Sequence, residues 1–175
     1  MPPITKFRGQ YGFLSNFYEA PITYDGRVWP TTEHAFAAFK TVHHNEQEYI
    51  REQPSPGAAK RAGRSVELRP DWEQVKVSVM YAVCYAKFQQ HPDLGKRLLA
   101  TGDAVLIEGN TWGDREWGCV DGRGRNLLGQ TLMNVRTALR VEAQIWQQVL
   151  QAEAAGEGSV PSPLAIHYPD RESSP

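Results

Sequence analysis

Two long segments of this chain carry apolar residues at the spacing of an α-helix. The first opens at 69–71 and should run to about His91, where Pro92 stops it. The second begins near Asn126, continues to about Ala155 and has its apolar residues at i, i+4, i+7 and i+11. The sequence therefore predicts a mainly helical fold. The apolar positions are Trp72, Val75, Val79, Ala82 or Val83, and Ala86 in the first segment, and Leu128, Leu132, Val135 and Leu139 in the second.

A β-hairpin is predicted ahead of these helices. The apolar runs ITY (22–24) and RVW (27–29) flank Asp25-Gly26, and such a two-residue turn tolerates the positive φ that a hairpin demands. Pro30 ends the second strand, and Thr31 or Thr32 can cap the helix that follows.

Shorter elements complete the predicted fold. We expect a helix over 58–63, a helix capped by Asp93, and a short buried strand over 104–108. Together these elements make one α+β domain over residues 1–155, a helix cluster with an N-terminal β-hairpin. Residues 156–175 are rich in Gly, Ser, Pro and charge, which predicts a disordered tail.

Composition excludes several classes of function. The chain is 41% hydrophobic and 22% charged, so it can build a core, and its net charge of −1 gives no argument for bulk nucleic-acid binding. No apolar run approaches the roughly 20 residues that span a membrane. The N-terminus lacks the apolar core of a signal peptide, and Cys84 and Cys119 lack metal-type spacing. Reduced thiols in the cytoplasm are expected.

One segment that can carry chemistry is WPTTEH, residues 29–34. Its acid, Glu33, falls in the first turn of the predicted helix, where the helix dipole favours a carboxylate. A structural role therefore explains Glu33 well. A catalytic role requires the side chain to face a cleft.

A second segment, EGNTWGDREWG, places two tryptophans, three acids and three glycines within residues 108–118. Glycines let a backbone approach a ligand, tryptophans offer stacking faces, and carboxylates can face hydroxyls or a developing cation. A loop folded back over a hydrophobic patch is an equally open interpretation.

Weaker candidates lie elsewhere. Residues 121–126, DGRGRN, precede a predicted helix, so their backbone amides and arginines could hold a phosphate. A solvated glycine-rich turn explains that segment nearly as well. His43-His44, near the end of a helix, are expected to be surface histidines rather than metal ligands.

At these residues the sequence resembles the YbiA/NADAR family. The similarity covers about residues 7–140 in the family's order, and the WPTTEH and EGNTWGDREWG blocks are specific. The matching blocks are FRGQYGFLSNFY (7–18), WPTTEHAFAAFK (29–40), DWEQVKVSVMYAVCYAKF (71–88), LLATGDAVLIEGNTWGDREWG (98–118) and NLLGQTLMNVR (126–136).

The resemblance implies a mainly helical fold with short strands around one pocket, and cleavage of ribosyl C–N bonds. One branch of the family acts on early ribosylamino-pyrimidine phosphates of riboflavin biosynthesis, and another removes ADP-ribose from guanine bases. The family's functional positions correspond to Glu33, Trp72, Asp114 and Trp117. Some members have an acid directly after the Trp-Gly pair, where this chain has Cys119.

From this resemblance we expect Glu33 and Asp114 to be the catalytic carboxylates. The expected substrate-binding residues are Trp72, Trp117, Asn126 and Asp121, which is the first acid after the Trp-Gly pair. A preorganised carboxylate stabilises the oxocarbenium-like transition state of ribosyl transfer, and a second one can activate water or protonate the leaving nitrogen. Neither a metal nor a cofactor is required.

The expected substrate is a ribosylamino-pyrimidine 5′-phosphate, a small molecule. ADP-ribosylated guanine is the alternative substrate, which would make the protein an ADP-ribosylglycohydrolase. A non-catalytic module that binds NAD or ADP-ribose is the alternative from another class. The two acids Glu33 and Asp114 speak against such a module, because binding a polyphosphate gives no reason to keep them.

Overall fold

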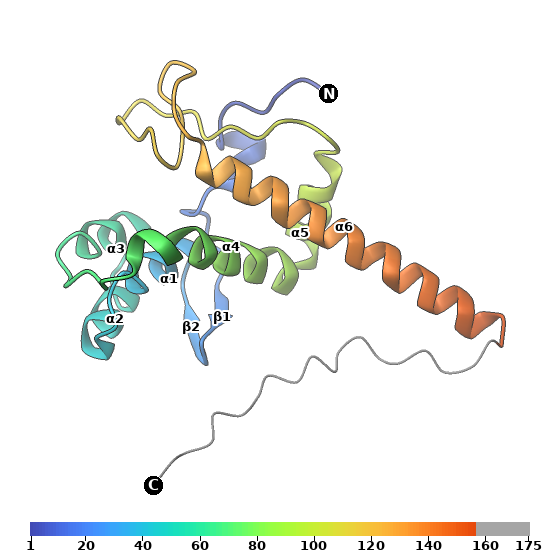
Figure 1. Ribbon diagram of the computed structural model, residues 1–175, viewed down its shortest axis with the longest axis horizontal. Coiled ribbons are helices and arrows are strands. Elements are labelled where there is room, and N and C mark those ends of the chain that lie inside the picture. The colour runs from blue at the N-terminus through green and yellow to red at the C-terminus, as the bar shows by residue number, and fades with distance from the viewer. Residues whose placement is uncertain (157–175) are drawn as a thin grey trace, which may run out of the picture. The chain divides into compact units, whose positions relative to one another are not determined.

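The computed structural model describes residues 1–156, and helices dominate it (Figure 1). The tail predicted at 156–175 lies outside the described residues except for Gly156. No helix within residues 1–156 has the length and apolar character to cross a membrane. In chain order the elements are η1 (Gly9–Leu14), β1 (Ile22–Tyr24), β2 (Arg27–Trp29), α1 (Thr32–Ala38), α2 (His44–Arg51), α3 (Pro56–Ala62), α4 (Trp72–Gln90), α5 (Pro92–Ala100) and α6 (Leu127–Ala154).

The chain divides into two compact units within α6. The first unit ends at Arg140 and contains all the other elements, and the second begins at Val141. In the described part of the second unit, α6 leaves several large apolar side chains exposed. These are Val141, Ile145, Trp146 and Leu150.

The predicted hairpin is confirmed. Strands β1 and β2 pair in antiparallel register, with Ile22 opposite Trp29 and Tyr24 opposite Arg27. The turn residues Asp25 and Gly26 both have positive φ, 51° and 70°, as a type I′ turn requires. Trp29 is fully buried, and its indole Nε1–H donates to the Tyr24 carbonyl over 2.9 Å, which fixes the ring beneath the turn.

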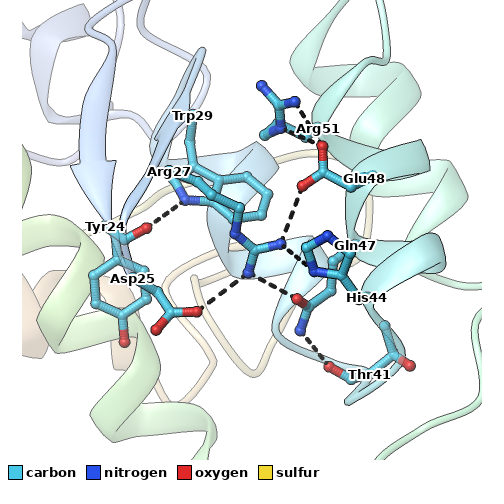
Figure 2. Close-up of polar contacts among 9 residues, drawn as sticks. All are labelled: Tyr24, Asp25, Arg27, Trp29, Thr41, His44, Gln47, Glu48 and Arg51. Atoms are coloured by element: carbon cyan, nitrogen blue, oxygen red, sulfur yellow. Dashed lines mark hydrogen bonds and ion pairs between the residues drawn. The ribbon is translucent and has the colours of Figure 1, made fainter.

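Arg27 joins the hairpin to α2 (Figure 2). Its guanidinium donates to Gln47 Oε1 over 2.8 Å, to Glu48 Oε1 over 3.1 Å and to Asp25 Oδ2 over 3.2 Å. It also lies over the Trp29 ring, 4.8 Å from its centroid. One side chain therefore connects the turn, the core tryptophan and α2.

Helix α1 lies at the centre of the first unit, in contact with α2, α3, α4 and β2. Thr31 is its N-cap, since its hydroxyl accepts from the His34 amide. All seven residues of α1 are buried. His34 hydrogen-bonds through both ring nitrogens, to Thr31 Oγ1 (2.8 Å) and to the Gln53 carbonyl (3.0 Å), and burial lowers its pKa. The histidine of the WPTTEH block therefore has a structural role.

The two long helices are confirmed with their predicted faces. In α4, Trp72, Val79, Val83 and Ala86 are buried, while Val75 packs partly buried against the core. The face of α6 is formed as predicted within the first unit by Leu128, Leu132, Val135 and the partly buried Leu139.

Three local predictions are wrong. Residues 104–108 form one parallel bridge, Leu106 with Ile4, instead of a strand, because only a single residue of the N-terminal segment pairs there. Pro92 both ends α4 and occupies the first turn of α5, whose N-cap is His91, so Asp93 is not a cap. His44 begins α2, a helix that the sequence did not reveal because it buries only two side chains.

Candidate active site

A cavity of about 670 Å³ brings the two nominated segments together. Its wall comes from the N-terminal segment, α1, α3, α4, the first turn of α6 and residues 108–117. Three carboxylates line it, Glu33, Glu108 and Asp114. Aromatic rings lie on the same wall, from Phe7, Phe17, Phe36, Trp112 and Trp117. This arrangement of acids and flat apolar faces can hold a ring beside charged groups.

Glu33 enters the cavity from the first turn of α1. Its backbone amide donates to the Asn16 carbonyl over 3.1 Å, and the residue is only 7% exposed. Burial raises the pKa of this carboxyl, the positive charges of Lys60 and Lys40 oppose the shift, and Asp114 adds to it. Glu33 is thus a poorly hydrated carboxyl that interacts with the second predicted acid.

Asp114 combines two tasks. Its Oδ1 accepts the backbone amides of Glu116 (3.0 Å) and Trp117 (2.9 Å), which closes the turn that carries Trp117. Its own amide donates to Asn110 Oδ1 over 3.0 Å. The amides of Glu116 and Trp117 both donate to Asp114 Oδ1, so Asp114 Oδ2 is the carboxylate oxygen available to a ligand in the cavity.

Contacts on both sides hold the segment around Trp117 in place. Glu116 forms salt bridges with Lys76 of α4 (2.6 Å) and Arg125 (3.4 Å). The first amides of α6 donate to the carbonyls of Glu116 (3.1 Å) and Trp117 (3.0 Å). The start of α6 therefore finds its hydrogen-bond acceptors in the backbone of the cavity wall.

Glu108 is a functional candidate that the sequence analysis did not select. Burial, followed by the charge of Asp114, raises the pKa of Glu108 to about 7. Within the described residues its Oε2 is buried and has no hydrogen-bond partner. The signal in the sequence was its position, directly after the apolar run AVLI and at the head of the 108–118 block.

Trp72 does not line the cavity. It is 7% exposed and lies behind Phe36, with ring centroids 5.2 Å apart. Phe36 also contacts Trp117, and the centroids of these two rings lie 5.0 Å apart in an edge-on arrangement. Trp72 thus supports the aromatic wall, and Phe36 and Trp117 form its surface.

Asp121 and Asn126 are also absent from the cavity wall. Asp121 is exposed, with a φ of 51°, in the turn closed by Val120 and Arg123. Asn126 accepts from the Glu108 amide (3.0 Å) and donates to the Leu106 carbonyl (2.8 Å). Asn126 therefore positions the backbone of Glu108, and no residue of the DGRGRN segment lines the cavity.

Comparisons with known proteins agree with this architecture. The model of the NADAR domain family matches residues 5–140. N-glycosidase YbiA of Escherichia coli (strain K12) is 46% identical over 135 residues, which are 75% of this chain and 84% of that protein. An N-glycosidase of Nostoc punctiforme is 38% identical over 136 residues, covering 74% of this chain and 86% of that protein.

Two further comparisons extend the similarity. A riboflavin biosynthesis protein of Vibrio vulnificus is 40% identical over 136 residues, 76% of this chain but 37% of that longer protein. The NMR structure of E. coli YbiA superimposes with a TM-score of 0.73 at 42% identity, covering 82% of this chain and 86% of that chain. The family match covers most of the chain and includes every residue that lines the cavity, so the chain belongs to the NADAR family.

Proposed function

We propose that this chain is a hydrolase that cleaves the ribosyl C–N bond of ribosylamino-pyrimidine 5′-phosphates. The observation that carries this proposal is the meeting of Glu33, Glu108 and Asp114 in one aromatic-walled cavity. Its relatives named N-glycosidase support the reaction class, and the relative named a riboflavin biosynthesis protein supports the substrate. The proposed catalytic domain is residues 1–155, and its proposed location is the cytoplasm, in keeping with two free, buried thiols.

The proposed reaction divides the work among the three carboxyls. As the C1′–N bond breaks, its electron pair leaves with nitrogen, which takes a proton from Glu108. Positive charge develops on C1′ and the ring oxygen, where an ionised carboxylate in a dry site stabilises it. Water then adds to C1′ and gives its proton to a carboxylate. Glu33 and Asp114 share the last two roles, and the products are ribose 5-phosphate and the free amino-pyrimidine.

The pKa of Glu108, about 7, suits a proton donor that works near neutral pH. The aromatic side chains suit the other half of the substrate. A flat base fits against Trp117 and Trp112, since stacking on indole is favourable for any heteroaromatic ring.

The relatives' names favour this substrate over the two alternatives. They describe N-glycosidases and a riboflavin biosynthesis protein rather than a glycohydrolase of ADP-ribosylated guanine. A non-catalytic NAD or ADP-ribose module is disfavoured further, because it would have no use for the buried, unpaired oxygen of Glu108.

The deciding experiment is mass spectrometry of products after incubation with a ribosylamino-pyrimidine 5′-phosphate and, separately, with ADP-ribosylated guanosine. We expect release of the free amino-pyrimidine and ribose 5-phosphate from the former. Turnover of ADP-ribosylated guanosine alone would favour the second substrate. Tight ADP-ribose binding without turnover of either compound would mean that the chain is a binding module.

A further inference from the structure

Five basic side chains line the cavity beside the carboxylates. Arg8 comes from the N-terminal segment, and the other four come from α1, α3 and the residues that follow them. Lys40 follows the C-terminus of α1, Lys60 and Arg61 are in the last turn of α3, and Arg64 follows the C-cap of α3. These cations come from segments that the sequence analysis did not nominate. Residues 121–126, the weaker candidate for holding a phosphate, do not line this wall.

Close packing of α3 on α1 brings these cations together. A Cβ on Gly63 would lie 2.9 Å from the Cβ of Ala37 and 3.2 Å from its carbonyl oxygen, so a side chain there would push the helices apart. Burial lowers the pKa of Lys40, Glu33 opposes that shift, and the charges of Lys60 and Arg64 add to it. The three cations therefore repel one another across this helix contact.

No ion pair within residues 1–156 relieves this repulsion. None of the four side chains forms a salt bridge or donates a hydrogen bond in the described part of the chain, although Lys40 and Lys60 lie 5.8 Å from the rings of Phe36 and Phe17. Six basic side chains elsewhere in residues 1–156 do form such pairs. Those in salt bridges with carboxylates are Arg27, Arg51, Arg69, Lys76, Arg125 and Arg140.

We infer that Lys40, Lys60, Arg61 and Arg64 form the subsite for the 5′-phosphate of the ribosyl substrate. The inference rests on the function proposed above and states which wall binds the sugar end. A phosphate monoester carries about −1.5 to −2 charges near neutral pH, and a guanidinium can bind two of its oxygens at once.

The subsite also orients the substrate. Lys60, Lys40 and Arg64 are the cations whose charges act on Glu33, so a phosphate held among them places the ribose beside that carboxyl. The base then extends toward Glu108, Asp114 and the tryptophans, which supply the proton and the stacking faces.

The test compares kcat/KM for the ribosylamino-pyrimidine 5′-phosphate and for the same compound without its phosphate. Arg61→Ala and Arg64→Ala are the test variants, because both side chains are exposed and their truncation leaves the core intact. Arg123→Ala is the matched control, an exposed arginine of the 121–126 segment outside the cavity. We expect the wild type to prefer the phosphorylated compound. Each test variant should reduce that preference about 10- to 100-fold, the loss of one charge-assisted contact, while Arg123→Ala keeps it.

A binding arm needs no turnover. Ribose 5-phosphate should raise the melting temperature of the wild type more than ribose does, and Arg61→Ala and Arg64→Ala should lose most of that difference. ADP-ribose is measured alongside as the other source of a ribose 5′-phosphate group. Stabilisation by ADP-ribose with none by ribose 5-phosphate would overturn the monoester assignment.

The outcomes separate this inference from the proposed function. Equal cleavage of both compounds, or unchanged preference in both arginine variants, would overturn the subsite and leave the N-glycosidase standing. If the wild type cleaves neither compound, the proposed function fails and the binding arm decides the subsite. Ribose 5-phosphate stabilisation that depends on the two arginines would then support it, and its absence would overturn it.

Discussion

Glu108 and Asp114 line the same cavity, and burial together with the charge of Asp114 raises the pKa of Glu108 to about 7. The two acids therefore differ in what they can offer a substrate at neutral pH. Glu108 is available in its protonated form, while Asp114 uses one carboxylate oxygen to hold the turn of Trp117. Acid and base roles in one site require such a difference between neighbouring carboxyls.

Removing the charge of either proposed catalytic acid should suppress turnover. We expect Glu33→Gln and Asp114→Asn each to lower kcat about 10²- to 10³-fold with a smaller change in KM, because the charge acts mainly in the transition state. Asparagine keeps an oxygen for the amides of Glu116 and Trp117, so the turn should survive. Steady-state release of the free base measures both. Near-normal kcat in the two variants would contradict the mechanism.

The pH profile should reveal Glu108 as the acid. If Glu108 must be protonated, kcat falls as pH rises through about 7. An acid limb should appear above the usual range of a glutamate, because Glu33 must be ionised and burial raises its pKa. Glu108→Gln should lower kcat and abolish the basic limb. A variant that loses activity but keeps the wild-type profile would assign Glu108 a structural role.

The ionised form of Glu108 should lower the free energy of unfolding at high pH. A carboxyl whose folded-state pKa exceeds its unfolded value destabilises the fold as pH rises between those two values, here from 4.5 to about 7. Since the group is half-buried and partly screened, we expect Glu108→Gln to add about 1–2 kcal/mol to the free energy of unfolding near pH 8. The gain should vanish near pH 4. Urea denaturation at both pH values tests this, and an equal effect at both would contradict it.

The two motif tryptophans should behave differently. Trp117→Ala removes an aromatic side chain from the cavity wall, so KM should rise. Stacking of one base on an aromatic side chain contributes about 1–3 kcal/mol in single-strand-binding proteins, and we expect a loss of binding free energy of that order. Trp72→Ala removes a buried ring behind Phe36 and should lower the free energy of unfolding by about 3–5 kcal/mol. Kinetics and denaturation of both variants separate the roles. A rise in KM at full stability in Trp72→Ala would restore it as a direct ligand.

Neither thiol should be needed for turnover. Burial raises the pKa of Cys84 to about 12, so it stays protonated, and its Sγ lies 3.6 Å from Asn16 Oδ1. Cys119 is 8% exposed and is absent from the cavity wall. We expect Cys84→Ser and Cys119→Ser to retain activity. Loss of turnover in a folded Cys119→Ser protein would reopen covalent catalysis.

Local chemistry made much of the fold predictable. The Asp25-Gly26 turn and the apolar spacing of the two long helices are encoded within a few residues of each element. Residues 104–108 were misread because their pairing depends on Ile4, about a hundred positions away. No local pattern distinguishes one bridged residue from a strand.

The site was predictable only in part for the same reason. Glu33, Asp114 and Trp117 could be nominated from their motifs, and all three line the cavity. The high pKa of Glu108 depends on burial by distant segments, and Asn126 turned out to hold the backbone of Glu108. Lys60 and Arg64 could not be nominated, because a net charge near zero does not indicate where a local cluster of cations lies.

Helix α1 has no exposed residue, so Glu33 belongs to a helix that is packed entirely within the first unit. A change at any residue of this helix disturbs a packed neighbour, and folding and chemistry are constrained together there. Substitutions are less constrained at the exposed residues of the cavity wall, which are Arg61, Arg64 and Trp112. Divergence in substrate preference among descendants of this chain should therefore accumulate at these exposed residues, while the proposed position of C–N bond cleavage, beside Glu33, should be inherited with the fold.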